Sequence, residues 1–243
     1  MNEEKVLQTE KTSNKTVGEL VADDYCTAKV FEKYGIDFCC GGRIGLSEAC
    51  REKNIDLVSL LTEINAVRSE PLERSQNFAA WTLPFLADYI VNTHHGYLNE
   101  NTRQIAVYTR KIAEVHGLHH PEVIDIALIF DQIATDMEAH LREEEEVLFP
   151  AIKRIDAARK SGAETEATDL NVLKDCLGKL NKEHDAIGDA VHRIRDLSKR
   201  YTVPADACTT FALTYRLLKE FEDDLHKHVH LENNILFPKA AKL

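Results

Sequence analysis

Apolar residues from Thr82 onward recur at alternating intervals of four and three, a spacing that sets one stripe of side chains along one face of a long α-helix. Turn signals at Pro121, residues 161–169 and Pro204 divide this region into four such helices. Short connections favour antiparallel neighbours, so we expect an all-α, antiparallel four-helix bundle. The four stripes hold, in chain order, Val91, His95, Leu98, Thr102, Ile105, Thr109 and Ile112; Ile126, Ile133, Met137, His140, Glu144 and Val147; Leu173, Leu177, Leu180, His184, Ile187, Val191 and Ile194; and Leu218, Phe221, Leu225, His228, Glu232 and Ile235.

The residues before the bundle predict a smaller helical module. Thr16 and Glu19 have the spacing of a capping box and open a helix that Gly35 ends. A short helix around Leu46–Cys50 and a further helix capped by Asp56 follow. We therefore expect a disordered tail over residues 1–15, this module over 16–70, a polar linker over 71–80 and the bundle over 81–243.

An internal repeat singles out individual residues on the bundle stripes. The segment HLREEEEVLFP, which begins at His140, returns 88 residues later as HVHLENNILFP, which begins at His228. Both copies share the first His, the Glu four residues on, and the final Leu-Phe-Pro. Residues four apart lie on one face of a helix, so His140 with Glu144, and His228 with Glu232, each direct an imidazole and a carboxylate to one point.

Two further histidines complete the pattern. His95 precedes His140 by 45 residues and His184 precedes His228 by 44, so each half of the bundle is a helix pair of the same size. Buried carboxylates and imidazoles without partners cost several kcal/mol each, about 2–7 for a neutral group. A bundle with six of them on its inner stripes must pair them or bind metal with them. We expect a two-metal site at His95, His140, Glu144, His184, His228 and Glu232.

The structural alternative to a metal ligand, for one histidine on a stripe, is a hydrogen-bonded core residue. A single His-x-x-x-Glu is likewise often only a side-chain pair on one helix face. Two copies together with His184 favour the metal site instead. His94 is adjacent to His95 and chemically equal to it, so the stripe spacing favours His95 only modestly. His226 and His230 fall off the ligand face. The remaining histidines lie in a turn or off the stripe, where surface solvation explains them: His116, His119, His120 and His192.

The donor set indicates the metal. Six nitrogen and oxygen donors without thiolate suit two octahedral ions that share bridges, whereas zinc prefers fewer ligands in a tetrahedron. Iron is the usual occupant of such bundle sites, and manganese is the alternative.

Cys39 and Cys40 stand side by side in the segment IDFCCGG. Two thiols alone cannot supply the four ligands of a structural zinc site or an iron-sulfur cluster. The following glycines permit close approach of another surface, and thiols exposed at such a turn suit transient metal capture or redox change. An incidental tight turn between helices is the equally weighted alternative.

Charge and composition restrict the partners. The net charge of −11 and the lack of clustered Lys and Arg argue against nucleic acid or an anionic membrane surface as partner. No signal peptide or membrane span is expected, so we expect a cytoplasmic protein whose six cysteines are reduced. The sequence leaves a monomer and a homodimer equally open.

The motifs YGIDFCCGG, HHGYLNE, HLREEEEVLFP, EHDAIGD and HVHLENNILFP, in this order, resemble the Repair of Iron Centres family of haemerythrin-like proteins over roughly residues 16–240. The resemblance implies a non-haem di-iron centre with oxo and carboxylate bridges at the six residues above. It further implies repair of iron-sulfur clusters damaged by nitric oxide or peroxide during oxidative or nitrosative stress, by iron donation to damaged client proteins, with Cys39 and Cys40 as relay thiols.

Two other functions fit the same ligands. The iron pair could reduce two nitric oxide molecules to nitrous oxide, which would make the protein an enzyme, or it could bind oxygen or nitric oxide reversibly as a sensor. No DNA-binding, signalling or transmembrane segment accompanies the bundle, so a sensor would lack an output within this sequence. Cluster repair is the first interpretation and nitric oxide reduction the second.

Overall fold

The computed structural model describes residues 15–68 and 77–243, and over these ranges it contains helices and turns but no β-strand. The expected disordered tail lies outside the described residues except for Lys15, and so does most of the expected linker, of which Phe78–Ala80 forms a 3-10 turn. Within the described part of the chain, no helix combines the length and apolarity that crossing a lipid bilayer requires. The all-α fold expected from the sequence is confirmed.

The chain divides into two compact units. One comprises Met1–Thr82 together with Val229–Lys242, and the other comprises Leu83–His228 with Leu243. The second unit holds most of the long helices and is called the bundle here; the first, to which the end of the last long helix (Val229–Lys242) belongs, is called the small unit.

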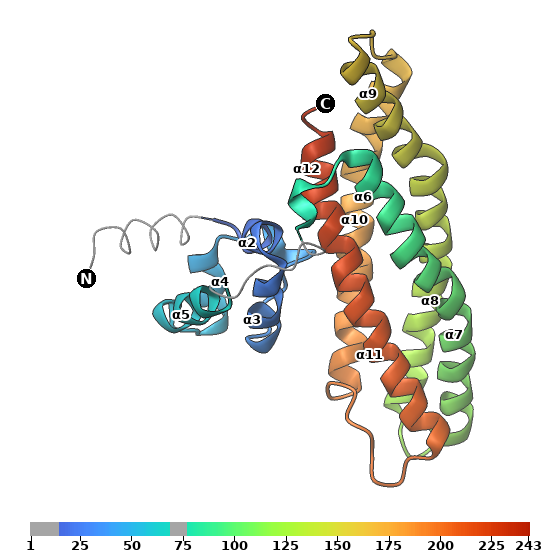
Figure 1. Cartoon of the computed structure of the whole chain (residues 1–243). Helices are drawn as coiled ribbons and strands as arrows, with labels where there is room; N and C mark the ends of the chain where they lie inside the picture. Colours follow the sequence, from blue (N-terminus) through green and yellow to red (C-terminus); the bar gives the residue numbers. More distant parts are fainter. Residues whose placement is uncertain (1–14, 69–76) are drawn as a thin grey trace. The chain divides into compact units, whose positions relative to one another are not determined.

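Long helical rods run side by side through the bundle (Figure 1), and the described residues form four of them. Three of them contain a π-helical turn, in which the backbone hydrogen bonds reach one residue further than in an α-helix. The rods are α6 (Leu83–Ile90) joined through the π-turn Val91–His95 to α7 (Gly96–His116); α8 (Glu122–Glu143) joined through the π-turn Glu144–Leu148 to α9 (Phe149–Ser161); α10 (Ala167–Leu197); and α11 (Thr209–His230), which continues through the π-turn Leu231–Leu236 into α12 (Phe237–Ala240).

The apolar stripes pack inward as expected, with one instructive exception. Phe130 of α8 meets Phe221 of α11 edge to face with ring centroids 5.1 Å apart, which ties these two rods together through the core. Val147, assigned to the buried stripe, is instead 40% exposed, and Leu148 is fully buried in its place. The π-turn causes this difference, because it adds one residue to the turn that follows Glu144 and shifts every later side chain by one position.

The small unit contains short helices. They are α2 (Val17–Asp23), a 3-10 turn (Tyr25–Thr27), α3 (Ala28–Lys33), a 3-10 turn (Gly41–Arg43), α4 (Leu46–Lys53) and α5 (Leu57–Arg68). The capping box of Thr16 and Glu19 is present, and Gly35 follows α3 with a positive φ of 64°. The single helix expected from Thr16 to Tyr34 is wrong, because Asp24 adopts an extended conformation and its carboxylate accepts the Cys26 amide proton at 2.9 Å.

The turn that carries the two cysteines lies close to another backbone of the small unit. A Cβ added at Gly42 would come within 3.0 Å of the Cα of Gly18 in α2, so only glycine fits there. In the same unit, the Asn234 side chain donates a hydrogen bond to the Phe38 carbonyl at 3.0 Å. The close approach that the glycines predicted is therefore confirmed, and it occurs between parts of one unit.

Candidate metal centre

Each of the four rods delivers one buried histidine to the centre of the bundle. His95 ends the first π-turn, His140 lies in the last turn of α8, His184 lies in the middle of α10, and His228 lies near the end of α11. Each of these residues is at most 2% exposed. Glu144 begins the second π-turn and Glu232 lies in the third, and both are fully buried.

The four imidazoles face one another as two pairs through their Nε2 atoms. The Nε2 atoms of His95 and His228 are 3.2 Å apart, and those of His140 and His184 are 2.9 Å apart. Glu144 lies between the pairs, with its Oε2 3.4 Å from His95 Nε2 and 3.5 Å from His140 Nε2. Each pair of histidines forms a group of four donors together with Glu144 and Glu232, which both groups share. Within each group, the four ligand atoms lie within 4.8 Å of one another.

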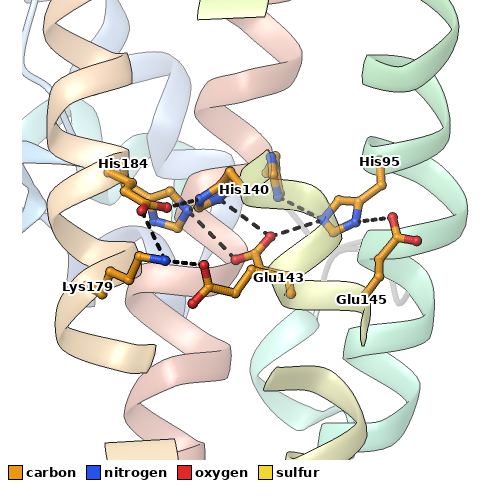
Figure 2. Close-up of polar contacts among 9 residues, drawn as sticks. His95, His140, Glu143, Glu145, Lys179 and His184 are labelled. Carbon is orange, nitrogen blue, oxygen red and sulfur yellow. Dashed lines mark hydrogen bonds and ion pairs between the residues drawn. The ribbon is translucent and has the colours of Figure 1, made fainter. Parts of the chain in front are cut away.

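The opposite nitrogen of two of these rings is held by a carboxylate. The Nδ1 of His95 lies 2.8 Å from Glu145 Oε1, and the Nδ1 of His140 lies 2.8 Å from Glu183 Oε2 (Figure 2). An ionised carboxylate can only accept, so in each case Nδ1 carries the proton and Nε2 keeps its lone pair for a metal. This carboxylate support is typical of histidines that bind metals.

A lysine links the supporting carboxylates on one side of the cluster. Lys179 of α10 contacts Glu143 and also lies 3.6 Å from Glu183 (Figure 2). Its positive charge lies beside the Glu183 carboxylate and does not enter the cluster itself. The positive charge that the buried ligands would need is thus not supplied by lysine.

The residues fit a pair of bound cations. Neither carboxylate oxygen of Glu144 accepts a hydrogen bond from any described residue, although both are fully buried. Two nitrogens that bind the same ion, each at about 2.1 Å and with an N–ion–N angle of about 90°, lie about 3.0 Å apart. This separation matches both Nε2 pairs. Without an ion, both Glu144 oxygens would stay buried with no hydrogen-bond donor among the described residues. The cluster therefore has the donors that a bound cation requires.

The structure distinguishes the two adjacent histidines. His95 joins the cluster, whereas the Nδ1 of His94 lies 2.8 Å from Asp224 and its ring stacks on His228 at 6.0 Å. His94 thus occupies a supporting position beside the cluster. The stripe spacing that favoured His95 agrees with this arrangement, while the ligand role of each residue stays a prediction.

Cys39 and Cys40 form a second group of donors, in the small unit. The Cys39 thiol lies 3.1 Å from Asp37 Oδ1 and 3.9 Å from the Cys40 sulfur, and the three residues could hold one ion. The expectation of exposed thiols is wrong for Cys39, which is 3% exposed, while Cys40 is partly exposed. The hydrogen bond with Cys40 and burial together raise the pKa of the Cys39 thiol well above its ordinary value, so this thiol keeps its proton.

Reasoning from the sequence missed the supporting carboxylates. Glu145 is one of four consecutive glutamates, and the second repeat has Asn233 in its place, so the repeat could not identify it. Glu183 directly precedes His184 in the chain but contacts His140 on another rod, which no local spacing reveals. Asp37, two residues before Cys39, was the one missed residue with a local signal, because an aspartate often accepts the amide proton two residues on.

A four-helix bundle that buries paired histidines around shared carboxylates is a haemerythrin-like cation-binding domain. Residues 86–240 match the family model described as "Hemerythrin HHE cation binding domain", and residues 13–68 match one described as a domain of unknown function. The chain is 33% identical to the iron-sulfur cluster repair protein ScdA of Staphylococcus haemolyticus, over 95% of this chain and 99% of that protein.

Two further relatives extend this result. The ScdA protein of Staphylococcus epidermidis is 31% identical over 95% of this chain and 99% of its own length, and the iron-sulfur cluster repair protein YtfE of Yersinia pseudotuberculosis is 29% identical over 94% and 97%. The chain belongs to the haemerythrin-like family that contains ScdA and YtfE. The resemblance drawn from the sequence motifs is confirmed.

Proposed function

We propose that this protein repairs damaged iron-sulfur clusters, and that it does so by donating iron held at a di-iron centre in the bundle. The observation that carries the proposal is the pair of His-His groups that share Glu144 and Glu232, since two ions with common carboxylates account for every buried donor in the cluster. The relatives that are named for cluster repair match nearly the full length of the chain, including the segment with the paired cysteines.

Each ligand has a defined part in this proposal. His95 with His228 would hold one ion, His140 with His184 would hold the other, and Glu144 and Glu232 would be shared by both. Glu145 and Glu183 keep the rings of His95 and His140 turned with Nε2 inward. When bound, the iron pair supplies one-electron redox chemistry and a transferable ferrous ion.

The donor set favours release on reduction. Carboxylate oxygen is a hard ligand that prefers ferric iron, whereas thiolate binds softer ions. One electron from an external reductant converts each ferric ion to ferrous, which weakens its hold on Glu144 and Glu232. The group of Asp37, Cys39 and Cys40 then receives ferrous iron in exchange for thiol protons. A reducing compartment keeps both sulfurs available as thiols.

The first test measures metal content and lability. Protein purified without oxygen is assayed for iron and zinc, and a chelator that colours with ferrous iron is added before and after reduction with dithionite. We expect about two irons per chain, inert when oxidised and captured when reduced. Iron that stays bound after reduction would contradict donation, and zinc or no metal would contradict the di-iron assignment.

The second test concerns the cysteines. The iron-loaded protein is mixed with an enzyme whose [4Fe–4S] cluster has been damaged by nitric oxide, and recovery of that enzyme's activity is followed. We expect the Cys39→Ala/Cys40→Ala double variant to retain its iron but lose most of the reactivation rate. Cys208→Ala removes an exposed thiol of the bundle and should behave as wild type. Full reactivation by the double variant would overturn the relay.

The two other functions are not adopted, because the relatives described above are named for cluster repair. Nitric oxide reduction can be tested in the same preparation. Steady production of nitrous oxide over many turnovers, faster than client recovery, would replace the repair proposal with an enzyme.

A further inference from the structure

A second group of metal donors lies within the bundle, apart from the central cluster. His192 of α10 and Glu222 and His226 of α11 bring two imidazoles and a carboxylate within 4.8 Å of one another. The rings of His192 and His226 meet edge to face with centroids 5.6 Å apart, and His226 Nε2 lies 3.7 Å from Glu222 Oε1. His192 follows His184 by two helical turns, which separates the two groups by about 12 Å along α10.

No local spacing connects these residues. His192 and His226 lie off the ligand stripe and belong to different rods, and surface solvation was a sufficient explanation for His192. Glu222 and His226 are four residues apart on α11, which is the spacing that also joins His140 to Glu144 in the central cluster. The same local geometry therefore occurs twice in the bundle, and α10 adds one histidine to it in both places.

The carboxylate of this group is held in position. Glu222 is 4% exposed, and Arg195 of α10 lies 3.1 Å from its Oε1. Burial raises the pKa of the Glu222 carboxyl, which shows that one guanidinium does not fully offset the cost of its charge. A hydrogen-bonded partner that orients a ligating carboxylate is a common feature of metal sites. Arg195 also limits the affinity, because its positive charge opposes that of a bound ion.

We propose that His192, Glu222 and His226 bind a third metal ion, a divalent first-row transition ion such as Fe²⁺ or Zn²⁺. Two imidazoles and one carboxylate are ligands that both ions accept, and three protein ligands leave coordination positions open to water. His192 is partly exposed and His226 is 14% exposed in its side chain, so solvent reaches the site. The site binds its ion more weakly than the buried cluster and exchanges it with solution.

A metal-uptake experiment tests the proposal on the full chain. Protein first loaded with iron is dialysed without oxygen against micromolar Zn²⁺, and both metals are counted per chain by mass spectrometry. Iron that stays bound through the dialysis reports the central cluster, because the third site exchanges its ion with solution. The zinc count is compared between wild type and His192→Gln, so zinc that enters the central cluster appears in both and cancels.

We expect wild type to take up one zinc that His192→Gln lacks, with a loss of affinity greater than about 10-fold. His119→Gln removes an exposed histidine outside every donor group and should bind as wild type does. Glu222→Gln, which removes the only anionic ligand, should also lose this zinc. Equal uptake by wild type and His192→Gln would overturn the proposal. The comparison holds whether or not the central cluster donates iron, so it fails independently of the repair proposal.

Discussion

Buried carboxylates in the bundle are satisfied in two different ways. Asp169, 5% exposed at the start of α10, receives three close nitrogen contacts from the Arg154 guanidinium, at 2.6, 3.0 and 3.2 Å. Glu144 is fully buried, and the nitrogens nearest to it in the described residues are imidazole Nε2 atoms whose protons are held on the other side of the ring. The first carboxylate has a permanent cation, and the second has only lone pairs around it.

This difference separates a structural charge from a functional one. An arginine that could reach Glu144 would make the bundle independent of metal, but it would also occupy the place of the ions. The absence of a guanidinium from the described surroundings of Glu144, in a protein that uses one at Asp169, indicates that the central charge is left for a metal. The predictions below test this contrast.

The largest effect is expected from Glu144→Gln, because Glu144 belongs to both donor groups. Loss of this charge should lower the affinity for both ions by more than about 100-fold. This loss exceeds the roughly 10–100-fold that is typical when a residue supporting a ligand is replaced. Metal counts after dialysis against a competing chelator provide the measurement. Glu146→Gln alters an exposed glutamate two residues away and is the matched control. Retention of two ions by Glu144→Gln would contradict the assignment.

The same variant should have the opposite effect once metal is removed. In the metal-free protein, glutamine replaces a buried charge with a neutral group of the same shape, so unfolding should require about 1–3 kcal/mol more than for metal-free wild type. Denaturant unfolding of both proteins in chelator checks this ranking. A metal-free variant less stable than metal-free wild type would mean that Glu144 is satisfied within the protein.

A smaller loss is expected from the supporting carboxylates. Glu183→Gln should weaken binding at the His140–His184 pair by about 10–100-fold, and Glu145→Gln should do the same at the His95–His228 pair. Stepwise metal titration followed by mass spectrometry distinguishes one weakened site from two. Glu138→Gln, on an exposed face of α8, is the control. If each variant weakened both sites equally, the carboxylates would act on the bundle as a whole.

The smallest effect concerns the arginine pair. Arg154→Ala should lower the free energy of unfolding by about 1 kcal/mol at neutral pH, since Arg154 is 59% exposed and solvent screens part of the interaction. Arg154 holds the pKa of Asp169 below its ordinary value, so the pair contributes its full stability above pH 4 or so and loses it as the pH falls through the lower, folded-state pKa.

The difference between wild type and Arg154→Ala should therefore narrow on acidification below about pH 4, measured by denaturant unfolding. Arg142→Ala, which removes an exposed partner of Glu138, should change stability by less than about 0.5 kcal/mol. A gap that stayed the same toward low pH would show that Arg154 stabilises the protein through packing and not through its charge on Asp169.

The sequence was sufficient for the rods and for the central group because both depend on local spacing. His140 with Glu144, and His228 with Glu232, are four apart, and duplication showed which of many acidic residues to choose. Relationships across rods had no such signal. The contact of Glu183 with His140 and the meeting of His192 with His226 both depend on how neighbouring helices are rotated, which a hydrophobic stripe defines only coarsely.

Local backbone chemistry accounts for the other differences. Asp24 interrupts a helix that the apolar pattern alone would continue, because its side chain competes for the amide of Cys26. The π-turns were also missed. A stripe with intervals of four and three has the same pattern in an α-helix with or without a π-turn, up to the position where the extra residue is inserted. Val147 and Leu148 are both apolar, so the sequence could not reveal which of them is buried.

The three π-turns also set which changes of length the chain can accept. One extra residue rotates everything that follows by about 100° relative to an uninterrupted α-helix. Leu148 and Phe149, like Leu236 and Phe237 in the second copy, are buried downstream of such an insertion. Deleting a single residue from either turn would direct these side chains toward solvent, while many substitutions in the same turn would leave them in place. The number of residues around the ligands thus decides which side chains face the core more strictly than the identity of most of them does.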